Sequence, residues 1–190
     1  MIERYQTSDM KAIWSDQNKY KTWLDVELAA VEVLVEDGIV PKESYNTIKQ
    51  KASFSVERTL EIEKTTNHDV IAFLTNLAEN IGPDSRYIHM GMTSSDLLDT
   101  SMALQCKEAG EVILKKLIIF KNLLREKALE YKDTFQIGRS HGVHAEPITF
   151  GLKLALWSEE MNRNIERWED AISTISTGMI SGAVGTYQHL

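Results

Sequence analysis

The longest helical pattern in the sequence runs from Thr93 to about Tyr131, and no proline interrupts it. Apolar residues such as Ile113 and Leu117 recur along it at i, i+3 and i+4 spacing, which forms one apolar stripe over many turns. At about 1.5 Å per residue, a helix of that extent is roughly 50 Å long. Helices much longer than about 25 residues are typical of bundles and coiled coils. The run therefore predicts the spine of a helical bundle.

A second long amphipathic pattern follows, with apolar residues recurring from Leu154 to Ile175. We expect it to form a helix antiparallel to the first, with Pro147 in its first turn, where a missing backbone N–H costs nothing. Prolines and glycines are few, at 3 and 10, and alternating β-branched residues are scarce. The sequence thus predicts an all-α fold, with an N-terminal helical domain at 1–92 and the first part of a long-helix bundle at 93–190.

Shorter helices are expected in the N-terminal part of the chain. Ser8 and Asp16 have the side chains of N-caps, and Gly38 is suited to end a helix with a positive φ. Two further short helices are predicted, at 41–48 and at about 56–62.

The overall charge and the apolar content exclude some classes of protein. The formal net charge is -7 and the isoelectric point is near 5.3, which argues against a nucleic-acid binder that works through a basic surface. No apolar run approaches the roughly 20 residues of a membrane span. The single cysteine, Cys106, cannot form an intramolecular disulfide, so we expect a cytoplasmic protein. From the charge and the apolar content, we expect neither nucleic-acid nor membrane partners.

Polar clusters interrupt the helical patterns at 65–69, 89–96 and 140–146, and each contains a histidine. Thr66 and Asp69 have the spacing of a capping pair, which would place His68 in the first turn of a helix. Free backbone N–H groups at helix starts favour anionic ligands, although capping alone would also explain such clusters.

The third cluster lies in a glycine-rich segment at 138–147, which we expect to be a loop. The imidazole of His141 can exchange a proton near neutral pH, but a histidine between glycines is also common in simple turns. A metal site formed with His144 and Glu146 is disfavoured because no HExxH spacing is present. Nucleophilic catalysis through Ser140 is disfavoured because the GxSxG motif is absent.

Several of these segments carry a resemblance to a known family. Residues 65–70 (TTNHDV), 88–96 (IHMGMTSSD) and 138–147 (GRSHGVHAEP) are similar to the signature regions of the adenylosuccinate lyases, within the fumarase/aspartase superfamily. The opening residues 2–5 (IERY) and 10–15 are similar to the start of those enzymes. The match is collinear over essentially the whole chain.

This resemblance implies an all-helical homotetramer whose long helices bundle across subunits, with each active site built from three chains. It implies β-elimination of fumarate from adenylosuccinate, giving AMP, and from succinylaminoimidazole carboxamide ribotide in purine biosynthesis. The expected partner is thus a small-molecule nucleotide substrate. Neither a metal nor an organic cofactor is expected.

The resemblance also assigns roles to individual residues. His141 is the expected general acid, which protonates the leaving nitrogen. The hydroxyls of Thr93 and Ser94 are suited to a carboxylate on which negative charge develops. The full predicted substrate-binding set is Arg4, Tyr5, Asn67, His68, Asp69, His89, Thr93, Ser94 and Ser140. Within this set, His68 is expected to support the acid, and Arg4, Tyr5 and His89 to face the nucleotide and its phosphate.

The sequence departs from the family pattern in two ways. Ser140 stands where a threonine is usual, which keeps the hydroxyl. The serine-rich loop that supplies the general base in this family does not occur up to Leu190. We therefore expect an N-terminal fragment that is inactive alone. The alternatives are another fumarate-releasing lyase of the superfamily and a non-catalytic helical assembly scaffold.

Overall fold

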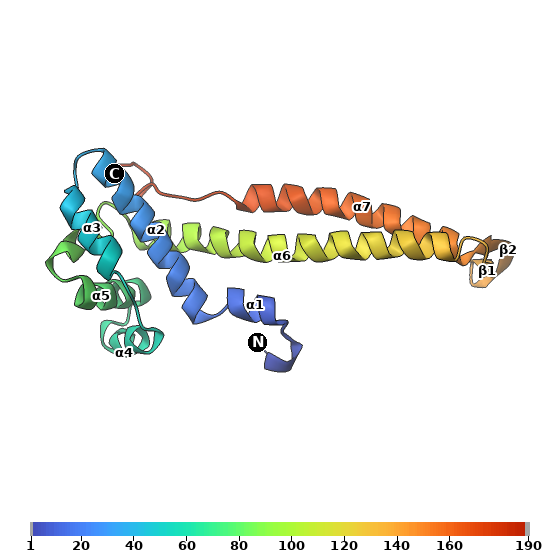
Figure 1. Ribbon diagram of the computed structural model, residues 1–190, viewed down its shortest axis with the longest axis horizontal. Helices are drawn as coiled ribbons and strands as arrows, with labels where there is room; N and C mark the ends of the chain where they lie inside the picture. The colour runs from blue at the N-terminus through green and yellow to red at the C-terminus, as the bar shows by residue number, and fades with distance from the viewer. Residues whose placement is uncertain (1, 189–190) are drawn as a thin grey trace. The chain divides into compact units, whose positions relative to one another are not determined.

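The computed structural model describes residues 2–188 (Figure 1). Within these residues the elements are helices, apart from one two-stranded hairpin. The predicted all-α class is confirmed. In chain order the elements are η1 (Glu3–Tyr5), α1 (Ser8–Ile13), α2 (Asp16–Glu36), α3 (Lys42–Lys51), α4 (Val56–Thr66), α5 (Asp69–Ile81), η2 (Pro83–Tyr87), α6 (Ser94–Glu130), β1 (Phe135–Ser140), β2 (Val143–Thr149) and α7 (Phe150–Ile175).

The chain forms two compact units. The first extends to Cys106 and includes the segment that starts at Ser176, and the second comprises Lys107–Ile175. Helix α6 begins in the first unit and continues into the second. The domain division predicted from the sequence, between residues 92 and 93, stays a prediction.

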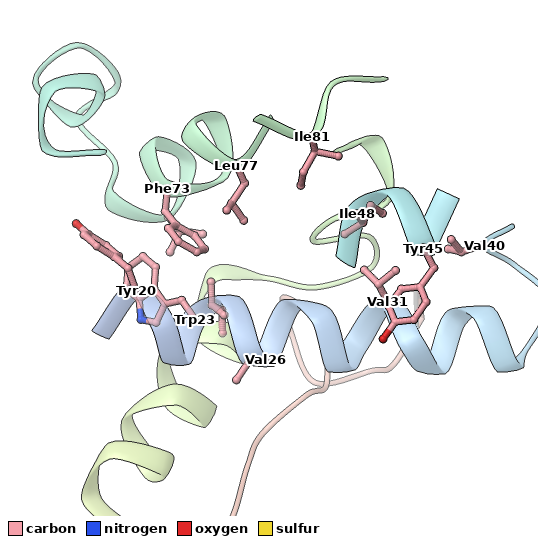
Figure 2. Close-up of a cluster of buried hydrophobic side chains, with 12 residues drawn as sticks. Tyr20, Trp23, Val26, Val31, Val40, Tyr45, Ile48, Phe73, Leu77 and Ile81 are labelled. Carbon is pink, nitrogen blue, oxygen red and sulfur yellow. The ribbon is translucent and has the colours of Figure 1, made fainter. Parts of the chain in front are cut away.

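The core of the first unit is built around aromatic side chains from α2 and α5 (Figure 2). The rings of Tyr20 and Phe73 stack with their centroids 5.5 Å apart, and Trp23 meets Phe73 edge-on at 5.4 Å. All three side chains are buried, and aliphatic residues such as Leu77 and Ile48 extend the cluster towards α3. The apolar residues of α2 thus face a core to which α5 and α3 contribute.

The N-caps of the first two helices, α1 and α2, each lie one residue before the predicted position. The N-caps are Thr7 and Ser15, whose side-chain oxygens accept hydrogen bonds from backbone N–H groups three residues on. Ser8 and Asp16, which the sequence suggested as caps, are instead the first helical residues. An N-cap residue has an extended backbone and a side-chain oxygen that accepts a hydrogen bond. Thr7 and Ser15, which immediately precede the two helices, have both. Gly38 has a φ of 74° after the end of α2, as expected.

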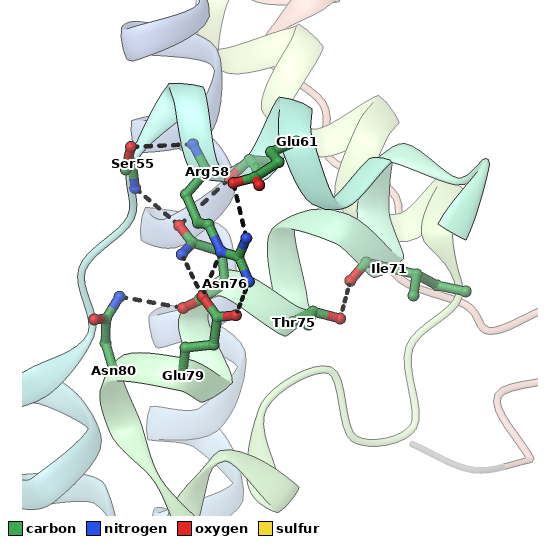
Figure 3. Close-up of polar contacts among 9 residues, drawn as sticks. Ser55, Arg58, Glu61, Ile71, Thr75, Asn76, Glu79 and Asn80 are labelled. Atoms are coloured by element: carbon green, nitrogen blue, oxygen red, sulfur yellow. Dashed lines mark hydrogen bonds and ion pairs between the residues drawn. The ribbon is translucent and has the colours of Figure 1, made fainter. Parts of the chain in front are cut away.

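Asn76 ties α4 to α5 from inside the first unit (Figure 3). Its buried side-chain oxygen accepts hydrogen bonds from the backbone N–H of Ser55 at 2.8 Å and from the hydroxyl of Thr59 at 3.4 Å. On the surface beside it, Arg58 donates two hydrogen bonds to Glu79, at 3.1 and 2.6 Å. These bonds lower the pKa of the Glu79 carboxyl, so their stabilising effect is present above the ordinary carboxyl pKa and is lost as the pH falls through the lowered value.

We expect Asn76→Ala to lower the free energy of unfolding by about 2 kcal/mol, because a buried donor (Thr59) and a half-buried one (Ser55) would lose their acceptor. Urea unfolding of the full-length protein measures this difference. Asn80→Ala is the matched control, since Asn80 is exposed and donates only to backbone carbonyls, of Ser53 and Asn76. An equal loss in both variants would contradict the role assigned to Asn76.

The second unit is an antiparallel pair formed by the C-terminal part of α6 and by α7 (Figure 1). The indole N–H of Trp168 donates to the carbonyl of Gly110 at 2.9 Å, and Lys121 donates to Asn162 at 3.4 Å. The pairing residues rise in number along one helix as they fall along the other, so the predicted antiparallel arrangement is confirmed.

The connection between the two long helices is a β-hairpin rather than the predicted loop. Strands β1 and β2 pair antiparallel, with Phe135 opposite Thr149 and Ser140 opposite Val143. Pro147 lies in β2 opposite Ile137, so its predicted place in the first turn of a helix was wrong. Proline cannot donate to a ladder, but an edge position in a two-stranded sheet tolerates it, and α7 begins only at Phe150.

Within residues 2–188, no helix is long and apolar enough to cross a membrane.

Candidate active site

Each of the three polar clusters contains a non-glycine residue with a left-handed backbone. The φ angles are 50° at Asn67, 63° at His89 and 53° at His141. Among the described non-glycine residues, only Tyr187 shares this conformation. Asparagine and histidine adopt it more readily than most residues, but it still costs energy and collects at functional sites. The conformation therefore singles out one predicted site residue in each cluster.

The first cluster lies between α4 and α5. Asn67 is the C-cap of α4, and its left-handed backbone turns the chain into α5. His68 is the N-cap of α5, and its Nδ1 atom accepts a hydrogen bond from the backbone N–H of Ile71 at 3.4 Å. The predicted capping pair of Thr66 and Asp69 was wrong, because Thr66 still belongs to α4 and its hydroxyl donates to the carbonyl of His68.

This cap has a chemical consequence for His68. Its Nδ1 atom faces the start of α5, 3.4 Å from the backbone nitrogen of Ile71 and 3.5 Å from Oδ1 of Asp69, so Nε2 is the ring nitrogen left for a ligand. The side chain is 41% exposed, so Nε2 is accessible to a ligand. Asp69 opens α5, and its carboxylate accepts from the backbone N–H of Val70.

Arg4 and Tyr5 lie together in η1. The guanidinium of Arg4 is 4.9 Å from the centre of the Tyr5 ring and donates to the Tyr5 hydroxyl at 3.0 Å. Both side chains are exposed, so the guanidinium retains donors for an anionic group.

The second cluster joins the turn after η2 to the start of α6. Ser94 is the first residue of α6, and Thr93 precedes it in the position of the N-cap. The backbone N–H of Thr93 donates to the carboxylate of Asp96 at 2.9 Å, which is the reciprocal bond of a capping box. His89 is held by the buried carboxylate of Glu27, whose oxygens lie 2.6 Å from His89 Nδ1 and 2.8 Å from its backbone nitrogen.

Asp96 also anchors the segment that follows α7. Its carboxylate is fully buried and accepts hydrogen bonds from the backbone N–H groups of Ser181 at 2.9 Å and Gly182 at 3.1 Å. One turn further along, the hydroxyl of Thr100 donates to the carbonyl of Met179 and accepts from its N–H, both at 3.0 Å. The first two turns of α6 are therefore packed against residues 179–182.

We expect Asp96→Asn to loosen this segment, because an amide has one acceptor oxygen where the carboxylate has two. Hydrogen exchange of the full-length protein should show amide protection at Ser181 and Gly182 falling about tenfold, the equivalent of one lost hydrogen bond. Asp99→Asn, a change to an exposed residue of the same helix, is the control. Unchanged protection in the Asp96 variant would contradict the anchoring role.

The third cluster forms the tip of the hairpin. His141 and Gly142 join β1 to β2, with φ angles of 53° and 76°, and the side chains of His141 and Ser140 are exposed there. Two positive φ angles match the twist that a tight hairpin requires. Arg139 lies beside His144 across the strands, with 3.4 Å between their side-chain nitrogens.

The strand pairing explains why a glycine, Gly138, stands just before this tip. The strand register shifts between Ile137 and Arg139, where one residue of β1, Gly138, stands opposite two residues of β2, so the extra residue of this bulge is in β2. A Cβ atom at Gly138 would lie 2.5 Å from the carbonyl oxygen of Glu146, so only glycine fits. The bulge bends β2 opposite Gly138 and increases the local twist of the hairpin that carries Ser140 at its tip.

The predicted site residues divide between the two units. Arg4, Tyr5, Asn67, His68, Asp69, His89, Thr93 and Ser94 belong to the first unit, and Ser140 and His141 to the second. Their assignment as site residues stays a prediction. Among residues 2–188, no group of three or more histidine, cysteine or acidic side chains is placed to hold a metal ion.

Two buried carboxylates were missed in the sequence, Glu27 and Asp96. Glu27 lies on the apolar stripe of α2, three residues after Leu24 and four before Val31, and a charge in that position was the available signal. Asp96 was noticed only as part of a helix start.

Comparisons with known proteins show which family this helical fold belongs to. The chain belongs to the lyase family, because the family model described as Lyase matches residues 3–190. It is 50% identical over its 190 residues to the adenylosuccinate lyase of Bacillus subtilis and 47% identical over the same length to that of Streptococcus mutans. The chain spans 44% of the length of each of these relatives.

Solved structures give the same result for the fold. A fumarate lyase from Mesorhizobium superposes with a TM-score of 0.88 at 26% identity, covering 94% of this chain and 43% of that one. A 3-carboxy-cis,cis-muconate lactonizing enzyme from Pseudomonas putida superposes with a TM-score of 0.88 at 27% identity, covering 97% and 44%.

Proposed function

We propose that this chain forms the acid-bearing and substrate-binding part of an adenylosuccinate lyase. The observation that carries the proposal is its identity of 50% and 47%, over all 190 residues, to two enzymes of that name. The substrates would be adenylosuccinate, which gives AMP, and succinylaminoimidazole carboxamide ribotide, and each would release fumarate.

The proposed reaction is a β-elimination. A base removes a proton from the carbon beside a carboxylate, the C–N bond breaks, and the electron pair of the C–H bond forms the double bond of fumarate. The nitrogen leaves with the bonding pair and takes a proton from His141. Thr93 and Ser94 would donate to the carboxylate on which charge develops, helped by the free N–H groups at the start of α6.

The local geometry supports these roles. The imidazole of His141 is exposed at the tip of a hairpin whose bulge and turn fix its backbone. The Nε2 atom of His68 is accessible to a substrate oxygen, with Asn67 and Asp69 beside it. Arg4, Tyr5 and His89 would face the nucleotide phosphate, and Ser140 would contribute its hydroxyl at the hairpin.

Exposed apolar side chains support assembly into a homotetramer with active sites shared between subunits. Large apolar patches on a surface mark interaction sites. The second unit exposes such residues on both of its long helices, namely Ile119, Phe120, Leu123, Leu129, Leu152, Leu156 and Trp157. We propose that the three clusters meet in this assembly. Light scattering of the full-length protein would measure its oligomeric state. A cytoplasmic location suits its soluble nucleotide substrates.

Steady-state release of fumarate by the full-length protein tests the proposal. We expect turnover of adenylosuccinate without added metal or cofactor. Activity only on another substrate in a panel of fumarate-releasing reactions would favour a different lyase of the superfamily. A protein that neither turns over nor binds any substrate of the panel would be the helical scaffold. In that case His68→Ala and Thr93→Ala would change no ligand binding, because there would be none to change.

A further inference from the structure

Glu27 is a charged residue in the interior of the first unit. Its side chain is fully buried on α2, and both of its oxygens bind the same residue, His89, which is far away in the sequence. One oxygen is 2.6 Å from Nδ1 of the ring, and the other accepts from the backbone N–H at 2.8 Å. A buried carboxylate is costly unless it is fully hydrogen-bonded, and here His89 supplies both bonds.

The backbone of His89 is itself in an unfavourable conformation. Its φ of 63° lies in the left-handed region, which glycine would adopt at less cost. Strain of this kind persists only where the surroundings fix the conformation, and it collects at functional sites. Glu27 supplies that restraint, because it holds the main chain and the side chain of His89 at the same time.

The hydrogen bonds also decide which ring nitrogen meets a ligand. Glu27 accepts at both oxygens, so Nδ1 of His89 must carry a proton, and Nε2 is the nitrogen left for another partner. An imidazolium donates from both nitrogens at once. It can therefore donate to Glu27 through Nδ1–H and to an anionic oxygen through Nε2–H. The ring retains some access to solvent, with 18% of the side chain exposed.

We infer that Glu27 is a positioning residue: it holds His89 so that Nε2–H is presented to an anionic oxygen of the substrate. The inference rests on the proposed function, in which His89 faces the substrate phosphate. Glu27 itself contacts no substrate and acts only through His89.

The variant Glu27→Gln separates this role from simple packing. Glutamine has the same shape but only one acceptor oxygen. If that oxygen keeps the bond to the backbone N–H, the amide NH₂ faces Nδ1, and the ring must then accept there and carry its proton on Nε2. His89 would offer the ligand a neutral donor in place of a charged one, and neutral hydrogen bonds are about half as strong.

A double-mutant cycle on the full-length protein tests the coupling. Glu27→Gln is expected to raise KM for adenylosuccinate about tenfold with kcat little changed. His89→Gln should raise KM at least as much, and the double variant should raise it no further, because Glu27 has nothing left to position. Glu36→Gln, an exposed change on the same helix, is the control. Multiplicative effects of the two substitutions would overturn the inference.

Ring protonation gives a second readout that needs no substrate. With ¹⁵N-labelled histidine in the full-length protein, NMR should find a proton on Nδ1 of His89, the ring nitrogen that faces Glu27. In Glu27→Gln, Nδ1 should carry no proton, with the resonance assigned by its loss in His89→Gln. An unchanged ring in Glu27→Gln would overturn the inference even in an active enzyme. A protein that releases no fumarate would overturn the proposed function but leave this measurement valid.

Discussion

Replacing His141 with asparagine is expected to lower kcat for fumarate release by about 10²- to 10⁴-fold, the usual contribution of a general acid. The nitrogen is a poor leaving group as an anion, so its departure depends on the proton that His141 supplies in the proposed mechanism. Asparagine tolerates the left-handed backbone at this position, where φ is 53°, so the hairpin should keep its shape. Steady-state kinetics of the full-length enzyme measure the effect.

His144→Asn is the matched control for this experiment. His144 lies three residues further on, in β2, where it is close to Arg139 rather than at the tip. We expect this change to reduce kcat by less than about tenfold, since it alters a hairpin contact and not the proposed acid. Normal turnover in the His141 variant would exclude the acid role. Equal losses in the two variants would point to a damaged hairpin instead.

Gly151→Ala should be among the most destabilising single substitutions in the second unit. A Cβ atom there would lie 2.6 Å from Cα and 2.7 Å from the nitrogen of Lys132, and it would also meet the carbonyl oxygen of Ala128. These are backbone atoms at the junction of α6 and α7, so no side-chain rotation relieves the clash. We expect the free energy of unfolding to fall by about 3 kcal/mol, measured by urea unfolding of the full-length protein.

Gly110→Ala offers a comparison on the same pair of helices. Its Cβ would come 2.8 Å from the Cγ1 atom of Ile172, which is a side-chain atom rather than backbone. Alanine also favours a helix over glycine by about 1 kcal/mol, which offsets part of the strain. The expected loss is therefore well below that of Gly151→Ala. A similar loss in both variants would contradict the distinction between backbone and side-chain obstruction.

Periodicity was sufficient to predict the long helices. The apolar stripe from Thr93 predicted a helix to about Tyr131, and α6 extends from Ser94 to Glu130. The pattern up to Ile175 likewise predicted the end of α7. Such patterns are local and repeat over many turns, so a few ambiguous residues do not change the conclusion.

The hairpin could not be read from the same signals. Its strands are short and mostly exposed, so they lack the alternation of a half-buried strand, and Pro147 favoured a helix start. Their pairing depends on the register shift at Gly138, where the opposite strand leaves no space for a side chain. That constraint comes from residues on the partner strand and is invisible along one segment of sequence.

The sequence by itself determined the helical class, the three polar clusters and the resemblance that assigns His141, because these depend on residue type and on short-range spacing. Only the tertiary structure decided which groups restrain those clusters. Glu27 reaches His89, and Asp96 reaches Ser181 and Gly182, across long stretches of chain. A buried carboxylate must find hydrogen-bond donors wherever folding brings them, and no local pattern records where those donors are.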